Sequence, residues 1–253
     1  MPRLPLSVFI IARDEAERLP ATLAAVRDWA GEIVVVDSGS TDATVKIAEQ
    51  ADARVFSRDW PGYGPQKRFG EEQCRHDWLL NLDADEVVTP ALAAEIAALF
   101  AGDPPPALFR IRILNVYPGD RRPRPFANDY NVVRLYHRAA GRYRDDPLFD
   151  RVVPVPGAAE RQLRAPIWHY PFLSFAGLVA KQDSFTSFQA EASGPRSPWL
   201  LRLRLLTEGP LTFLRFYLLR GHILGGWKGL AFAALAARAR TLRIIKLLDR
   251  QAR

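Results

Sequence analysis

The first hundred residues alternate between short apolar runs and segments with helical spacing, and this alternation constrains the fold more than any other feature. Continuous β-branched and aromatic runs are typical of strands that are covered on both faces. Such strands are expected at 6–12, 32–37, 54–57 and 78–83. Helices are expected at 15–28, 42–51, 66–75 and 90–100. This order predicts an α/β fold with a mostly parallel, Rossmann-like sheet of the nucleotide-binding kind.

The second part of the chain is expected to be more mixed. Three consecutive prolines at 104–106 interrupt the alternation, and a Ser-Gly-Pro-Arg-Ser-Pro linker follows at 193–198. Further strands are expected at 108–116, 132–137 and 151–155. The sequence therefore predicts a body at 1–192, divided into a nucleotide-binding half (1–103) and an acceptor half (104–192), and a helical tail at 199–253.

Charge separates the tail from the body. Residues 193–253 hold 12 Lys and Arg against 2 Asp and Glu, a net charge of +10. The remaining 192 residues hold 23 basic and 26 acidic side chains, a net charge of −3. Such asymmetry indicates a near-neutral body and a basic tail that binds something anionic.

Acidic residues follow three of the expected strands. Asp14 and Glu15 follow the first, Asp37 ends the second, and Asp83 and Asp85 end the fourth. Parallel α/β sheets bind ligands beyond the carboxyl ends of their strands. Residues two apart at a strand end project from one face, so Asp83 and Asp85 are expected to converge as oxygen ligands for Mg²⁺ or Mn²⁺.

Other nucleotide-binding classes fit the sequence poorly. A dinucleotide-binding dehydrogenase needs a glycine-rich turn after the first strand, whereas this chain has Ala12-Arg13-Asp14-Glu15 there. No Gly-Lys-Ser/Thr phosphate loop occurs in the sequence. The single cysteine, Cys74, excludes an internal disulfide framework and is expected to be a small buried hydrophobe.

Four segments together resemble the family 2 glycosyltransferases of GT-A fold. They are Ile10 to Leu19, Glu32 to Thr44, Asp59 to Lys67 and Asn81-Leu-Asp-Ala-Asp-Glu86. The third and fourth are similar to the lipopolysaccharide-core branch, which transfers glucose to core heptose. The resemblance implies an inverting, metal-dependent hexosyltransferase that uses a UDP-sugar, with glucose as the expected hexose.

The resemblance also implies roles for individual residues. The nucleotide sugar would be bound by Ala12, Arg13, Glu15, Asp37, Gln66, Lys67, Asp83 and Ala84. The metal on the diphosphate would be held by Asp83, Asp85 and His169. Lys67 would act as a phosphate counter-charge; the alternative for Gln66 and Lys67 is a solvated helix start. A hydrogen-bonded core histidine is the equal alternative for His169.

The catalytic base is expected in the acidic run at 145–151. Asp150 matches the acidic position of a His-Glu or His-Asp pair in the family, and Phe149 stands at the histidine position. Asp146 is the second candidate. The alternative is a turn in which Asp150 pairs with a cation, and the departure at Phe149 leaves open a non-catalytic nucleotide-sugar-binding module.

The tail interleaves large apolar and basic side chains, as interfacial helices on anionic membranes do. A packed helical subdomain is the alternative, and nucleic acid is disfavoured because exposed leucines contribute nothing to binding a phosphate backbone. No signal peptide or transmembrane run is predicted. We therefore expect a cytoplasmic protein, peripheral on the inner face of the cytoplasmic membrane, whose acceptor is a lipid-linked saccharide such as lipopolysaccharide core or another cell-envelope glycan.

Overall fold

The computed structural model describes residues 3–102, 104–127, 130–147, 150–191, 193–194 and 197–252. The chain forms two compact units. The sheet unit comprises Met1–Asn115 and Asn128–Tyr170, and the helical unit comprises Val116–Ala127 and Pro171–Arg253. The helical unit is therefore built from two separate stretches of the sequence.

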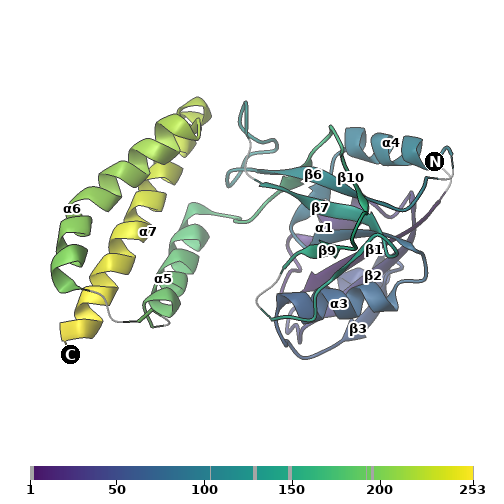
Figure 1. Ribbon diagram of the computed structural model, residues 1–253, viewed down its shortest axis with the longest axis horizontal. Helices are drawn as coiled ribbons and strands as arrows, with labels where there is room; N and C mark the ends of the chain where they lie inside the picture. Colours follow the sequence, from purple (N-terminus) through teal and green to yellow (C-terminus); the bar gives the residue numbers. More distant parts are fainter. Residues whose placement is uncertain are drawn as a thin grey trace. The chain divides into compact units, whose positions relative to one another are not determined.

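The sheet unit contains strands and helices in alternation, followed by strands alone (Figure 1). Its strands are β1 (Leu4–Ala12), β2 (Ala30–Asp37), β3 (Arg54–Ser57), β4 (Trp78–Asp83), β5 (Glu86–Val88), β6 (Ala107–Asn115), β7 (Tyr130–His137), β8 (Gly141–Tyr143), β9 (Val152–Pro154), β10 (Ala159–Gln162) and β11 (Ile167–His169). Its helices are α1 (Leu19–Ala24), α2 (Thr44–Gln50), α3 (Tyr63–Gln73) and α4 (Pro90–Leu99). The expected α/β class is confirmed.

The main sheet has the strand order β3-β2-β1-β4-β7-β6-β11-β5, and β10 also pairs with β6. Strands β1 to β4 are mutually parallel, as expected. Strand β7 runs antiparallel to both β4 and β6, and β5 runs antiparallel to β11. The first half of the sheet is thus the parallel wound half, and the second half is mixed.

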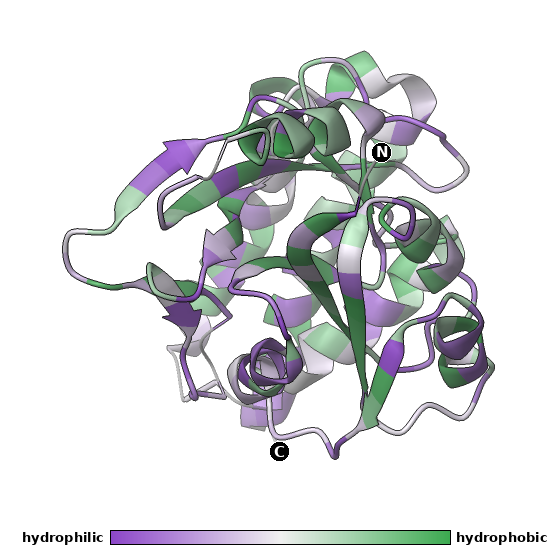
Figure 2. Ribbon diagram, turned by 90° about the vertical axis from the view of Figure 1, so that its right-hand side faces the viewer, coloured by the Kyte–Doolittle hydropathy of each residue, from purple (hydrophilic) through white to green (hydrophobic). Residues whose placement is uncertain are grey.

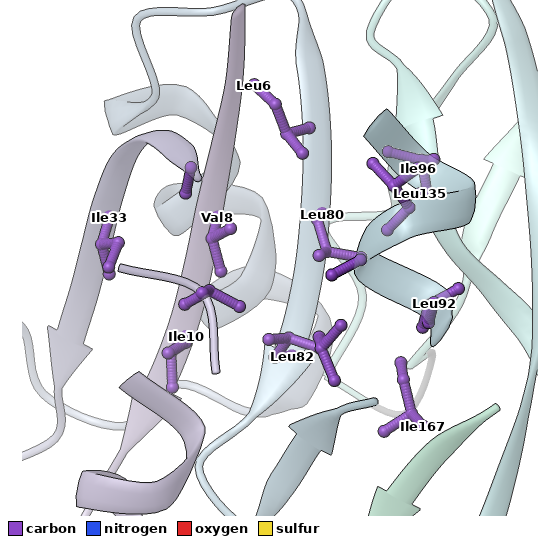
Figure 3. Packing of buried hydrophobic residues seen from close by; sticks show 14 of the residues in the cluster. Leu6, Val8, Ile10, Ile33, Leu80, Leu82, Leu92, Ile96, Leu135 and Ile167 are labelled. Carbon is purple, nitrogen blue, oxygen red and sulfur yellow. The ribbon is translucent and has the colours of Figure 1, made fainter. Parts of the chain in front are cut away.

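Each face of the central strands supports its own core, because successive strand residues point to opposite faces. Val8 and Ile10 of β1 pack on one face with Leu80 of β4 and with Leu92 of α4 (Figure 3). Phe9 and Ile11 of β1 pack on the opposite face, which α3 covers. Figure 2 shows these central strands in the green of apolar residues.

Helix α3 approaches the sheet closely at Gly70. A Cβ atom there would lie 3.1 Å from the Phe9 ring and 3.2 Å from Val36. Cys74, just beyond α3, is buried in the same core, as expected. Burial raises the pKa of its thiol to about 12.

Two details of the helices were predicted wrongly. The first helix begins at Leu19 rather than at residue 15. Pro20 lies in its first turn, where the missing N–H of proline costs no hydrogen bond within the helix. Helix α2 begins at Thr44 rather than at residue 42, and no side chain caps it. Ser40, which precedes it, hydrogen-bonds to the carboxylate of Asp37.

The helical unit contains α5 (Phe175–Glu191), α6 (Pro198–Leu214), the π-helical turn η1 (Arg215–Leu219), the 3-10 turn η2 (His222–Gly225) and α7 (Gly226–Ala252). Helices α6 and α7 form a hairpin whose turn is η1 and η2 (Figure 1). Its buried core is small and is centred on Leu201, Ile244 and Leu247. Among the described residues, none of the helices is both long and apolar enough to cross a bilayer.

Candidate active site

The carboxyl ends of three parallel strands meet at one edge of the sheet. Ala12 of β1 is paired in register with Asp37 of β2, and Ile11 is paired with Asp83 of β4. The expectation that acidic residues of separate strand ends share one rim is therefore confirmed. The strand register, rather than any contact between side chains, brings them together.

The loops after β1 and β2 are joined by hydrogen bonds. The Thr41 N–H donates to Asp14 at 2.7 Å, and the Glu15 N–H donates to the hydroxyl of Thr44 at 2.7 Å. Asp14 has a φ of 53°, in the left-handed region that L residues seldom adopt. The loops after β1 and β2, both predicted to bind the nucleotide, are thus held together by hydrogen bonds.

The nucleotide-site candidates differ in how they are held. Asp37 is buried and accepts hydrogen bonds from the N–H groups of Gly39 and Ser40, so its carboxylate shapes its own turn. The Arg13 side chain is 64% exposed. Gln66 is fully buried and donates to the Ser38 hydroxyl at 3.0 Å, which excludes a solvated helix start.

Arg18 connects the first loop to the acidic motif. Its guanidinium lies 2.6 Å from Glu15 and 3.2 Å from Asp85 Oδ2. The carbonyl of Ala84, between the two aspartates of the motif, accepts a hydrogen bond from Thr22 of α1 at 2.9 Å. The position of the motif is therefore fixed from the side of α1.

Lys67 is fully buried, with its ammonium group between two carboxylates. The Nζ atom lies 3.0 Å from Asp83 and 2.7 Å from Asp150. Burial alone would lower the pKa of Lys67, but the neighbouring carboxylates outweigh it and raise this pKa. The alternative prediction, in which Lys67 lies at a solvated helix start, is wrong, because its side chain has no exposed surface.

Arg134 of β7 forms the second cationic centre. Its guanidinium donates to Asn81 at 2.6 Å, to Asp83 at 2.7 Å and to Glu86 at 2.5 Å. Burial would raise the pKa of Asp83, but Arg134 and Lys67 hold that pKa well below its usual range. Both carboxylate oxygens of Asp83 are thus engaged by cations.

Asp85 and His169 form a separate pair. His169 Nε2 lies 3.3 Å from Asp85 Oδ1, and its Nδ1 lies 2.8 Å from the amide oxygen of Asn115. An amide oxygen accepts, so Nδ1 carries the hydrogen and Nε2 faces the carboxylate. Burial would lower the pKa of His169, but the Asp85 carboxylate outweighs burial and raises this pKa, which favours a proton on Nε2 when no metal is bound. Two acceptors face each other here unless a proton or a cation lies between them.

This pair fits a divalent cation. Neighbouring ligands on Mg²⁺, each at 2.0–2.1 Å, stand about 3 Å apart, close to the 3.3 Å between Oδ1 and Nε2. Asn115 orients the ring as outer-shell partners of ligating histidines do. In the described part of the chain, no group of three or more His, Cys, Asp or Glu could hold a metal. Asp83, the third expected ligand, faces Lys67 and Arg134.

A cavity of about 580 Å³ opens beside these groups. Asp83, Asp150 and His169 all line it, with Tyr143 and residues of β6 and β7 in its walls. The Asp150 side chain is 42% exposed, whereas Asp146, the second base candidate, does not line the cavity. Phe149 lies outside the described residues.

Arg134, Tyr143 and Asn115 were not singled out from the sequence. The sequence did contain a signal for Arg134, because it lies within the apolar strand run Val132 to Tyr136. A buried arginine requires carboxylate partners, so this position indicates a charged cluster inside the fold. Tyr143 donates to Asn81 at 2.8 Å, and its ring lies 5.6 Å from Lys67 Nζ. Nothing in the local sequence marks Tyr143 or Asn115.

Comparison with known proteins agrees with this architecture. The family model described as glycosyl transferase family 2 matches residues 7–154. The chain belongs to glycosyltransferase family 2. An uncharacterized glycosyltransferase of Rickettsia felis is 34% identical to this family 2 enzyme, over 96% of this chain and 89% of that protein.

A second relative carries a more specific name. The lipopolysaccharide core biosynthesis glycosyltransferase LpsC of Rhizobium meliloti is 30% identical, over 100% of this chain and 95% of that protein. Among solved structures, TarS of S. aureus matches 98% of this chain and 92% of its own, with 14% identity and a TM-score of 0.49. That score is too low to compare individual residues.

Proposed function

We propose that this family 2 glycosyltransferase transfers a hexose, expected to be glucose, from a UDP-sugar to a lipid-linked saccharide of the lipopolysaccharide core, with inversion at the anomeric carbon. The observation that carries the proposal is the cavity onto which Asp83, Asp150 and His169 open together. The full-length similarity to LpsC supports a core saccharide as the acceptor.

The donor end of the site is assigned to the rim and to the Asp85–His169 pair. The joined loops after β1 and β2, including Ala12, Arg13, Glu15 and Asp37, would hold the nucleotide. Asp85 and His169 would hold Mg²⁺ or Mn²⁺, with substrate oxygens and water as the other ligands. Such a cation would offset the negative charge that grows on the leaving diphosphate.

The acceptor end is assigned to Asp150. Its carboxylate lies in the cavity wall, where it can take the proton from an acceptor hydroxyl that attacks the anomeric carbon. Lys67 holds Asp150 and Asp83 at fixed positions through contacts of 2.7 and 3.0 Å. Lys67 is therefore a positioning residue, because its contacts reach the reaction through the two carboxylates.

Calorimetric titration of UDP and UDP-glucose, with and without Mn²⁺, tests the donor end. We expect Mn²⁺-dependent binding to the natural chain and to Asp28→Ala, a control at an aspartate that is 82% exposed, and no Mn²⁺-dependent binding to Asp85→Ala. Absence of binding by either nucleotide under both conditions would contradict the UDP-sugar assignment. Donor binding without transfer to any core saccharide would instead favour a non-catalytic binding module.

A further inference from the structure

The turn of the α6–α7 hairpin exposes a concentration of large apolar side chains. Leu219 is 84% exposed and Trp227 is 68% exposed. The others in this segment are Leu211, Leu214, Leu218, Ile223, Leu224 and Leu230. Single exposed leucines are ordinary, but so many within twenty residues indicate a contact surface.

The same segment carries positive charge. Residues 211–230 contain three basic side chains, Arg215, Arg220 and Lys228, and no Asp or Glu. Arg215 and Arg220 are exposed at the turn itself. Exposed leucine and tryptophan next to arginine, without a carboxylate, complement an anionic lipid surface better than they complement a protein or a nucleic acid.

A loop from the catalytic sheet is attached to this turn. The loop 116–127 connects β6 to β7 but belongs to the helical unit. The Tyr117 hydroxyl lies 2.5 Å from His222 Nδ1, Arg124 donates to the Arg220 carbonyl at 2.8 Å, and Lys228 donates to the Pro118 carbonyl at 2.8 Å. The loop and the hairpin turn therefore form one structure.

The loop contributes one carboxylate and further arginines to the surface. The carboxylate of Asp120 is paired with Lys228 at 2.5 Å, so the net positive charge of the surface comes from its arginines. Arg121 and Arg122 are exposed, and Phe126 is 91% exposed. Phe126 has a φ of 54°, a conformation unusual for a bulky residue. We call residues 116–127 and 211–230 together the tip surface.

We propose that the tip surface is where the enzyme binds an anionic bilayer, with its apolar side chains in the interfacial layer and its arginines among the headgroups. The inference rests on the proposed lipid-linked acceptor and locates its membrane contact. Strands β6 and β7, which the loop 116–127 connects, also line the active-site cavity through Ile113 and Val132. In the chain, the proposed lipid-binding loop therefore directly follows a strand that lines the cavity.

Sedimentation of the full chain with vesicles tests the proposal. We expect binding to phosphatidylcholine vesicles that contain phosphatidylglycerol, and little binding to phosphatidylcholine alone. Leu219→Glu is expected to weaken binding by about 10- to 100-fold, because it removes a large apolar side chain from the interfacial layer. Leu206→Glu is the matched control, because Leu206 is 75% exposed on α6 about two turns before the hairpin turn.

Selective labelling gives a second readout. Cys74 is buried and its thiol pKa is raised to about 12, so a cysteine introduced elsewhere reacts alone. An environment-sensitive fluorophore on Leu219→Cys should shift to the blue with anionic vesicles. The same fluorophore on Leu206→Cys should not.

Three results would overturn the proposal: no vesicle binding by the natural chain, equal losses for Leu219→Glu and Leu206→Glu, or a dimer in solution that Leu219→Glu dissociates. Equal losses would mean that α6 lies along the membrane over its whole length. UDP-glucose titration of Leu219→Glu separates this inference from the proposed function. Unchanged donor binding with lost vesicle binding supports both, and donor binding without any vesicle binding refutes only the tip surface.

Discussion

The ammonium group of Lys67 lies 2.7 Å from the carboxylate of Asp150. This contact ties the loop after β8 to helix α3, and Lys67 also lies 3.0 Å from Asp83 at the end of β4. One buried side chain therefore holds both the carboxylate that we assign to the donor end and the carboxylate that we assign to the acceptor end. A variant that removes the charge of Lys67 should mainly lower stability, and a variant of its partner Asp150 should mainly lower the transfer rate.

Lys67→Met should destabilise the fold, because it leaves Asp83 and Asp150 without a shared cation. Loss of one partner from a fully buried ion pair lowers the free energy of unfolding by about 3–5 kcal/mol. The loss here should be smaller, because Asp83 and Asp150 are 34% and 42% exposed and Asp83 keeps its contact with Arg134. Urea unfolding measures this change. Lys46→Met on α2 is the control, since Lys46 is exposed and its loss should alter the free energy of unfolding by less than about 0.5 kcal/mol. Equal effects would show that the buried contacts contribute nothing.

Asp150→Asn should lower kcat by about 10²–10⁴-fold, the range over which a positioned general base contributes. UDP-glucose affinity should remain unchanged, because the proton transfer belongs to the acceptor step. Asp146→Asn is the matched comparison, and it should retain most of the transfer activity. Radiolabelled sugar transfer to a core saccharide measures both variants. A larger loss for Asp146→Asn would reassign the base.

Asn115→Ala should weaken metal binding without removing a metal ligand. Its amide oxygen lies 2.8 Å from His169 Nδ1 and orients the ring. Loss of such outer-shell partners lowers metal affinity by about 10–100-fold. Mn²⁺ titration in the presence of saturating UDP, followed by calorimetry, measures the shift. An Asn115→Ala variant with the natural Mn²⁺ dependence would exclude His169 as a ligand.

Glu32 should contribute stability that disappears in acid. Burial would raise the pKa of Glu32, but hydrogen bonds from the Arg75 N–H, Ser7 and Arg54 outweigh it and lower this pKa below its usual 4.5. A carboxyl whose pKa is lower in the folded state stabilises the fold above about pH 4.5 and loses that contribution as the pH falls through the lowered value.

Glu32→Gln should therefore be less stable than the natural chain at neutral pH, and the difference should shrink below pH 4.5. Urea unfolding at a series of pH values measures it. Glu49→Gln, at an exposed position, should follow the natural chain at every pH. A difference that grows toward acid would contradict the assigned sign.

The parallel half of the fold could be predicted because its signals are local. The runs that form β3 and β4 were located to the residue. Strand β4 is a buried, mainly apolar run, whereas the short and partly buried β3 was recognised within the alternation of strands and helices. The shared acidic rim followed from the winding rule for parallel strands. Strands β5, β10 and β11 have three or four residues each, too few for any periodicity to show.

The charge network could not be predicted, because its members are distant in sequence. Lys67, Arg134 and Asp150 come from a helix, a strand and a loop that only the folded sheet unit brings together. Sequence patterns locate each element but not the direction of its side chains across a mixed sheet. The same limit applies to loop 116–127, whose partners Arg220 and His222 lie far along the chain.

The distance between those partners has a consequence for how the protein is made. Tyr117 is synthesised 105 positions before His222, the residue its hydroxyl contacts. Domains generally complete folding as units during synthesis, in the order in which the ribosome delivers them. The sheet unit can therefore close while its β6–β7 loop still lacks its partners. The nascent chain would acquire the complete tip surface only after the last helix has begun to emerge, when the catalytic sheet is already in place.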